Sequence, residues 1–185
     1  EAVSADQSEA QGVFDQAIQQ LDTGQPGAVA TLTRAANLGL AAAQLKLAGL
    51  YETGDNGVKP HPAEARLWAR RAAEGGDAQG MHAFGMYLFD GVGGAKNRPE
   101  ALNWLLKAAD KGLVDSQFNV AKIYENGDEG IAANPTEALK WYMIAARTGD
   151  TEAPTEVRRL SPQVQADGRR SARAAADAFQ IQPLA

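Results

Sequence analysis

The sequence of 185 residues contains no cysteine and only two histidines. The absence of cysteine excludes a disulfide framework, a thiol nucleophile and cysteine-ligated zinc, while it leaves the compartment open. Two histidines are too few for a histidine-rich metal site, so we expect no metal and no cofactor. No run approaches the roughly 18 apolar residues that cross a bilayer, which predicts no membrane span in this segment. The chain begins at Glu1 without Met or a leader, and we expect it to be a mature or excised fragment.

Basic residues are also few. Lys and Arg number 18 against 23 Asp and Glu, which gives a formal net charge of −5 and a pI near 5.1. Because binding to phosphates requires a dense basic surface, we expect no nucleic-acid partner. The charge is uneven: residues 1–60 carry three bases and seven acids, whereas residues 152–185 carry five arginines and four acids. These arginines either attract an anionic partner or form a solvated outer face.

Three tryptophans, Trp68, Trp104 and Trp141, stand 36 and 37 residues apart. Each is followed by an alanine pair after four residues and by a glycine after eight, and each is preceded by a proline and a glutamate. The aligned alanines and glycines are Ala72, Ala73 and Gly76, then Ala108, Ala109 and Gly112, and finally Ala145, Ala146 and Gly149. A degenerate fourth copy precedes them. These coincident columns indicate an internal repeat of about 36 residues.

Each repeat is predicted to form two helices. The first, for example residues 42–53, has apolar residues at helical spacing and ends at a glycine. The second begins at a proline that follows a polar N-cap residue, and the three N-cap positions are His61, Asn97 and Asn134. A helix pair of this size cannot cover its own apolar face, so neighbouring pairs must stack. The sequence therefore predicts an all-α, right-handed α-solenoid with one concave and one convex surface.

The repeat boundaries divide the chain into five segments. They are a degenerate N-terminal repeat or cap over 1–40, three repeats over 41–76, 77–112 and 113–149, and a C-terminal capping helix pair with a frayed tail over 150–185. In the cap we expect a helix over 152–160, an N-cap at Ser161 followed by Pro162, and a last helix over 164–179. From Gln180 we expect the chain to fray.

The repeat resembles the Sel1-like repeat family, relatives of the tetratricopeptide repeats. The stretch AAQLKLAGLYETGDNGVKPHPAEARLWARRAAEGG carries the family pattern, and residues 78–112 and 116–149 carry it as well. Where the pattern has Leu-Gly, this chain has Leu47-Ala48 and Val120-Ala121, and Leu88 replaces a tyrosine. These exchanges keep small or apolar residues and do not threaten the fold. The resemblance implies the solenoid fold and says little about activity.

A narrower resemblance involves VDSQFNVAKIYENG, EALKWYMIAARTGD and the predicted helix after Ser161-Pro162. These stretches are similar to the periplasmic C-terminal part of the PodJ-type polar localisation proteins of alphaproteobacteria. The resemblance implies a periplasmic domain of a larger inner-membrane protein. It also implies a scaffold at the cell pole that organises appendages and the cell cycle, in contact with peptidoglycan or envelope proteins.

The concave surface follows from setting the first helices on the tetratricopeptide pattern. Positions two before, two after and five after the Leu47 column should face the concave side. The candidate partner-binding residues at these positions are Leu45, Glu52, His82, Met86, Phe89, Phe118, Lys122 and Glu125. Gly49 occupies one further position of this set, and in the degenerate repeat the same positions hold Asp15, Gln19 and Asp22. The middle of this groove is apolar and its first end is acidic. We expect a partner helix or extended peptide with a basic end, although the column of Leu45, His82 and Phe118 is also suited to structural packing.

Two other functions are weighed against a protein-interaction scaffold. Acid–base catalysis would use Glu125 with Asp128 and Glu129, or Glu52 with Asp55. These carboxylates fall at helix ends and in loops, where they are ordinarily solvated, and the loops lack calcium-loop spacing, so we expect no enzyme and no metal site. A peptidoglycan- or glycan-binding module is the alternative. It would need exposed aromatic platforms, whereas most of the 12 aromatic residues fall in repeat columns.

Overall fold

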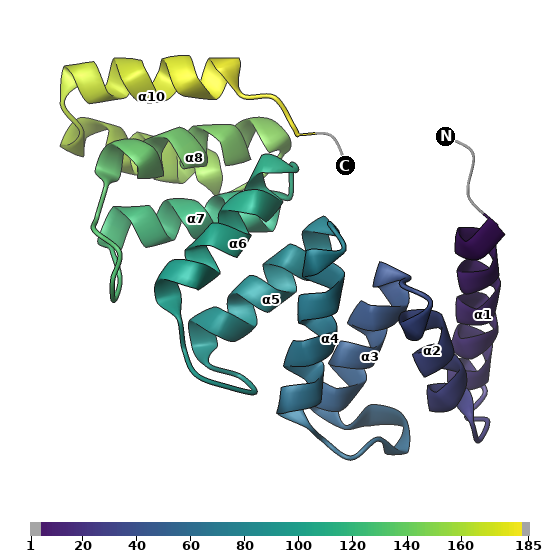
Figure 1. Cartoon of the computed structure of the whole chain (residues 1–185). Helices are drawn as coiled ribbons and strands as arrows, with labels where there is room; N and C mark the ends of the chain where they lie inside the picture. Colours follow the sequence, from purple (N-terminus) through teal and green to yellow (C-terminus); the bar gives the residue numbers. More distant parts are fainter. Residues whose placement is uncertain (1–4, 183–185) are drawn as a thin grey trace. The chain divides into compact units, whose positions relative to one another are not determined.

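The computed structural model describes residues 5–182 of the chain (Figure 1). Over this range the structure is helical and has no β-strand, only an isolated bridge between Asp128 and Ile131. The all-α fold class predicted from the sequence is confirmed. The chain divides into two compact units, Glu1–Lys96 (unit 1) and Asn97–Ala185 (unit 2).

Unit 1 is an array of helices in which each helix contacts the next. They are α1 (Ala5–Asp22), α2 (Ala28–Asn37), α3 (Ala41–Thr53), α4 (Pro62–Glu74) and α5 (Ala78–Asp90), with a 3-10 turn at Asp55–Gly57. Small residues at the contacts allow the helices to approach closely. At Gly80 of α5, an added Cβ would lie 2.6 Å from Ala72 of α4.

Unit 2 is organised around one central helix. Its helices are α6 (Arg98–Asp110), α7 (Val114–Asn126), α8 (Pro135–Thr148), α9 (Ala153–Leu160) and α10 (Ala166–Ala178), with a 3-10 turn at Ser161–Gln163. Figure 1 shows α10 lying along α8, and α8 also contacts α7 and α9. Because α8 is covered from three directions, its side chains form the core of the unit, and Leu139, Tyr142 and Ile144 are buried.

The predicted N-caps are confirmed. Nδ1 of His61 and the Oδ1 atoms of Asn97 and Asn134 accept hydrogen bonds from the backbone N–H three residues later, at 3.2, 3.1 and 3.2 Å. Each tryptophan follows its cap by seven residues, so the three occupy equivalent helix positions. Their burial differs, since Trp68 and Trp141 are buried whereas Trp104 is half-buried, with the Lys107 ammonium 4.4 Å from its ring centroid.

In two of the three predicted repeats, 77–112 and 113–149, an arginine on the second helix of the repeat before binds the loop between the two helices. In unit 1, the guanidinium of Arg66 on α4 donates to the carbonyl of Ala95 at 3.0 and 3.1 Å. In unit 2, Arg98 at the start of α6 donates to both carboxylate oxygens of Asp128 at 2.6 and 2.7 Å. A basic side chain on one helix therefore fixes the following loop in both units.

The C-terminal cap differs from the prediction in three respects. Ser161 does not cap the last helix, because its hydroxyl donates to the carbonyl of Val157 at 2.6 Å and the chain makes a 3-10 turn there. Val164 is extended, so the helix predicted from residue 164 begins only at Ala166. The fraying expected from Gln180 is not seen up to Gln182, whose N–H donates to the carbonyl of Asp110 at 2.7 Å. The remainder of the predicted frayed tail, 183–185, lies outside the described residues.

Candidate interaction surface

The candidate residues of unit 1 lie on two first helices that touch, α3 and α5. Glu52 is exposed, whereas Leu45, His82, Met86 and Phe89 are half-buried. The core of α5 is supplied by other residues, Met81, Phe84 and Leu88, which are 7%, 4% and 2% exposed. The half-buried side chains therefore lie at the margin of the core and keep part of their surface accessible. We call these five residues the α3/α5 face.

A hydrogen bond between the two helices fixes the carboxylate of the α3/α5 face. The hydroxyl of Tyr87 on α5 donates to Oε2 of Glu52 on α3 at 2.5 Å. Burial raises the pKa of the Tyr87 phenol, and the hydrogen bond and charge of Glu52 raise it further. The phenol thus stays protonated and holds Glu52 of α3 against α5. The sequence analysis did not single out Tyr87, although it lies one residue after Met86.

In unit 2 the candidate residues gather around one buried tyrosine. Phe118 of α7 contacts Tyr142 of α8 edge-on, with ring centroids 5.4 Å apart. The Lys122 ammonium lies 5.9 Å from the centroid of Phe118, and the Tyr142 hydroxyl donates to Oε2 of Glu125 at 3.0 Å. Phe118 is half-buried in this contact, so it contributes to packing as well as to the surface.

Glu125 makes more contacts than we expected for a carboxylate near a helix end, where such groups are ordinarily solvated. Arg159 of α9 forms an ion pair with Glu125 and a second with Glu156. Burial is the main reason that the pKa of Tyr142 is raised, and the hydrogen bond to Glu125 adds to it. Sequence reasoning counted Arg159 among the C-terminal arginines but did not place it in the candidate site, although extending the repeat by 37 residues puts it in the column of Lys122. The repeat length could therefore have identified Arg159 as a candidate residue of this surface.

The predicted site therefore falls into two sets, one in each unit. Leu45, Glu52, His82, Met86 and Phe89 belong to unit 1, whereas Phe118, Lys122 and Glu125 belong to unit 2. In unit 1 the predicted residues lie on two neighbouring first helices, α3 and α5, whereas in unit 2 all three lie on α7. A single groove made by all eight residues stays a prediction.

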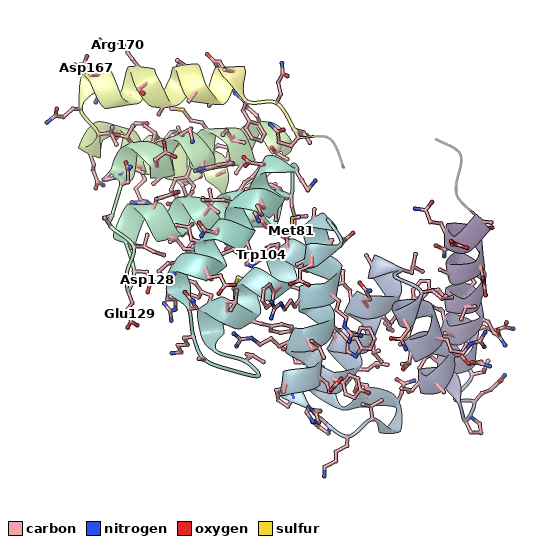
Figure 2. All side chains as sticks on the ribbon, viewed as in Figure 1. Met81, Trp104, Asp128, Glu129, Asp167 and Arg170 are labelled. Carbon is pink, nitrogen blue, oxygen red and sulfur yellow. The ribbon has the colours of Figure 1, made fainter. Side chains whose placement is uncertain are left out.

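Two of the carboxylates considered for catalysis, Asp55 and Asp128, make structural contacts. Figure 2 shows Asp128 and Glu129 in the loop between α7 and α8, where Asp128 is bound by Arg98. Asp55 accepts a hydrogen bond from the hydroxyl of Thr53 at 2.8 Å. Within residues 5–182, no three His, Asp or Glu side chains are grouped so that they could hold a metal ion. None of the described helices is long and apolar enough to cross a bilayer.

Comparison with known families identifies the repeat. The Sel1 repeat family model matches residues 41–77, 78–113 and 114–150, which make up more than half of the chain. This chain belongs to the Sel1 repeat family. Sel1 repeats mediate protein–protein interaction, and each matched repeat contains one first helix and one second helix, α3–α4, α5–α6 and α7–α8.

Relatives of this Sel1 repeat chain include regulatory and localisation factors. It is 40% identical over 82 residues, 44% of its length, to chitin synthase regulatory factor 3 of Schizosaccharomyces pombe, of which it covers 9%. It is 47% identical over 62 residues, 34% of its length, to the localization factor PodJL of Caulobacter vibrioides, of which it covers 6%. The chain thus spans less than a tenth of either relative.

Solved structures share the fold. The protective antigen c5321 of uropathogenic Escherichia coli, which has an SLR fold, matches 95% of this chain and 38% of its own, with a TM-score of 0.76 and 25% identity. A Sel1 repeat protein from Oxalobacter formigenes matches over 72% of this chain and 98% of its own, with a TM-score of 0.64 and 30% identity.

Proposed function

We propose that this chain is a non-catalytic protein-interaction module, and that its α3/α5 face binds an amphipathic helix or extended peptide with a basic end. The observation that carries the proposal is the partial exposure of Met86 and Phe89 on α5, the helix whose Tyr87 fixes the Glu52 carboxylate. Complete burial of a Met or Phe side chain stabilises a complex by at most about 1.5–3 kcal/mol. Two such side chains are enough to anchor a peptide of moderate affinity.

The charge of this face selects the partner's chemistry. Glu52 is exposed, and Asp55 and Asp90 lie close to the same ends of α3 and α5 in the sequence and are exposed as well. Helix C-termini carry a partial negative charge that adds to these carboxylates. A partner with Lys or Arg at one end and apolar residues at helical spacing would complement both parts of the face.

A peptide display experiment tests this proposal. Peptides selected on the immobilised chain should combine apolar anchors with a basic end. They should lose binding to the double variant Met86→Ser with Phe89→Ser. The matched control is Leu67→Ser on the second helix α4, which removes a side chain that is 40% exposed and should leave binding unchanged. Selected peptides that bind the double variant as well as the parent would refute the site, and a large fall in its melting temperature would place Met86 and Phe89 in the core.

We also propose that the module acts in the bacterial cell envelope, as a periplasmic domain of a larger inner-membrane protein that organises the cell pole. The 47% identity to PodJL over 62 residues supports this. Fusing alkaline phosphatase to the natural full-length chain next to this segment tests the compartment, because that enzyme gains activity only in the periplasm. An inactive phosphatase fusion together with a fluorescent cytoplasmic fusion would overturn this part of the proposal.

Peptidoglycan binding remains the second hypothesis. The structure gives it little support, because Trp68 and Trp141 are buried and offer no aromatic platform. Trp104 is half-buried beneath the Lys107 ammonium. Sedimentation with purified peptidoglycan at low salt decides the question. Pelleting that Trp104→Ala abolishes would support glycan binding, and the absence of pelleting would remove it.

A further inference from the structure

The tail segment, residues 179–182, docks along unit 2 after α10 ends. Phe179 leaves the helix in an extended conformation, and its ring meets the ring of Trp141 edge-on at a centroid distance of 5.7 Å. The Ile181 side chain lies against Gly112. The N–H of Gln182 donates to the carbonyl of Asp110, the last residue of α6, at 2.7 Å. Two side chains and one backbone group therefore tie the segment to α8 and to the end of α6.

The surface beneath the tail segment is one that repeat packing leaves open. Gly112 shares its place after a second helix with Gly39, Gly76 and Gly149, and all four have φ between 90 and 115°. An added Cβ would meet no atom within 4 Å at the other three glycines, whereas at Gly112 it would lie 2.9 Å from Cδ1 of Ile181. The tail segment, not a helix, covers this turn.

The tail segment fits this surface incompletely. A cavity of about 390 Å³ lies between α8, α10 and the segment, and it is lined by Ile144, Arg147, Thr148, Ala176, Phe179 and Ile181. Ile181 remains 59% exposed. Because Ile181 is largely exposed and Phe179 borders this open pocket, the segment is held by few apolar contacts, and a segment from another polypeptide can compete for the same site.

We propose that the tail segment is a latch over a peptide-docking site. The site accepts an extended segment with an aromatic residue followed two positions later by a β-branched aliphatic residue. The aromatic ring meets Trp141, the aliphatic side chain covers Gly112, and a backbone N–H satisfies the Asp110 carbonyl, which has no acceptor role inside α6. A segment of this chemistry from another polypeptide binds when the latch opens. This site is independent of the α3/α5 face.

Opening the latch in the full chain tests the proposal. The variant Phe179→Ala with Ile181→Ala removes both anchors and keeps the rest of the chain. A fluorescent peptide with the sequence of residues 177–182, DAFQIQ, should bind this variant saturably and at least about tenfold more tightly than it binds the parent, in which the site is already occupied. The control peptide DAAQAQ lacks both anchors and should not bind. Equal binding of the two peptides, or no DAFQIQ binding to a folded opened variant, would overturn the proposal.

Two further measurements guard against misfolding of the double variant. Ile181→Ala alone keeps the contact between Phe179 and Trp141 and should give an affinity between those of the parent and the double variant. Hydrogen exchange on the parent should find the Gln182 amide protected. Exchange at the rate of an unfolded peptide would show that no latch exists. Dimers of the parent that the double variant cannot form would support the site and identify a second copy as the occupant.

Discussion

Gln117 donates a hydrogen bond from Nε2 to the carbonyl of Ala109, at 3.2 Å, from a fully buried side chain. Gln44 makes the same contact eight residues back, to Ala36, at 3.1 Å. Both glutamines occupy one column of the first helix, and both satisfy a carbonyl at the end of the preceding second helix. The intervening repeat has Met81 in this column and buries it.

This relationship predicts that Gln117→Met is tolerated. The change removes one hydrogen bond, but Ala109 keeps the amide of Gly112 at 3.0 Å. It also removes the buried Oε1 of Gln117, which has no hydrogen-bond partner among the described residues. We expect the free energy of unfolding to change by less than about 1 kcal/mol, whereas Gln117→Ala should lose about 2–3 kcal/mol by opening a cavity. Urea denaturation measures both, and a larger loss for Met than for Ala would refute the comparison.

Gly80 should not tolerate alanine. A Cβ at this position would lie 2.6 Å from the backbone and side chain of Ala72, and this steric cost of about 1–3 kcal/mol exceeds the helix propensity gain of about 1 kcal/mol. The matched control is Gly12→Ala in α1, where no atom lies within 4 Å of the new Cβ. The control should stabilise the chain. Thermal unfolding of the two variants should therefore shift in opposite directions, and a stabilised Gly80→Ala would contradict the close contact of α4 and α5.

The N-caps predict a stabilising substitution. His61 holds the cap position that asparagine holds in the next two repeats, and asparagine is among the best N-cap residues. We expect His61→Asn to raise the melting temperature slightly. In contrast, Asn134→Ala should cost about 1 kcal/mol because the N–H of Glu137 loses its acceptor. Unchanged stability in Asn134→Ala would show that water replaces the cap.

Stability should fall at alkaline pH. Burial, and then the hydrogen bonds to Glu52 and Glu125, raise the pKa of Tyr87 and Tyr142 above the ordinary 10.0. The folded chain therefore keeps protons that the unfolded chain releases, so this stability is complete below about pH 10 and is lost as the pH rises further. Tyr142→Phe should lower the urea midpoint at neutral pH and reduce its decline above about pH 10. The same decline in parent and variant would contradict the raised pKa.

The sequence predicted the features that depend on local chemistry. Caps at His61, Asn97 and Asn134 could be inferred because a polar residue before a helix-starting proline has one common use. The helix pairs followed from a repeated pattern that averages out the noise of any single segment. The N-cap predicted at Ser161 was wrong, although it was inferred from the same kind of local pattern. Its residue type fits an N-cap, but here its hydroxyl bonds backward to Val157, and no repeat of that segment exists to correct the reading.

The polar contacts of the candidate site depend on tertiary packing, so local patterns were less informative. Tyr87 and Glu52 are 35 residues apart in the sequence, and Arg159 and Glu125 are 34 residues apart. Both separations are close to the length of one repeat. The column alignment placed these residues on matching helices but did not specify which side chains would pair. The packing of Ile181 against Gly112 could not be predicted from the sequence, because the tail segment has no counterpart in the repeats.

The loops after α5 and α7 are each bound by an arginine of the preceding repeat, and this affects where such chains can be cut and joined. Arg66 supports the loop that ends unit 1, and the boundary at Lys96 comes after that loop, between the two helices of one Sel1 repeat. The segment that keeps these contacts intact therefore does not coincide with a sequence repeat. It begins with the second helix of one repeat and ends with the loop inside the following repeat. Chimeras joined at Gly76 or Gly112 would separate these two loops from Arg66 and Arg98, whereas chimeras joined just before an N-cap would keep each loop with its arginine.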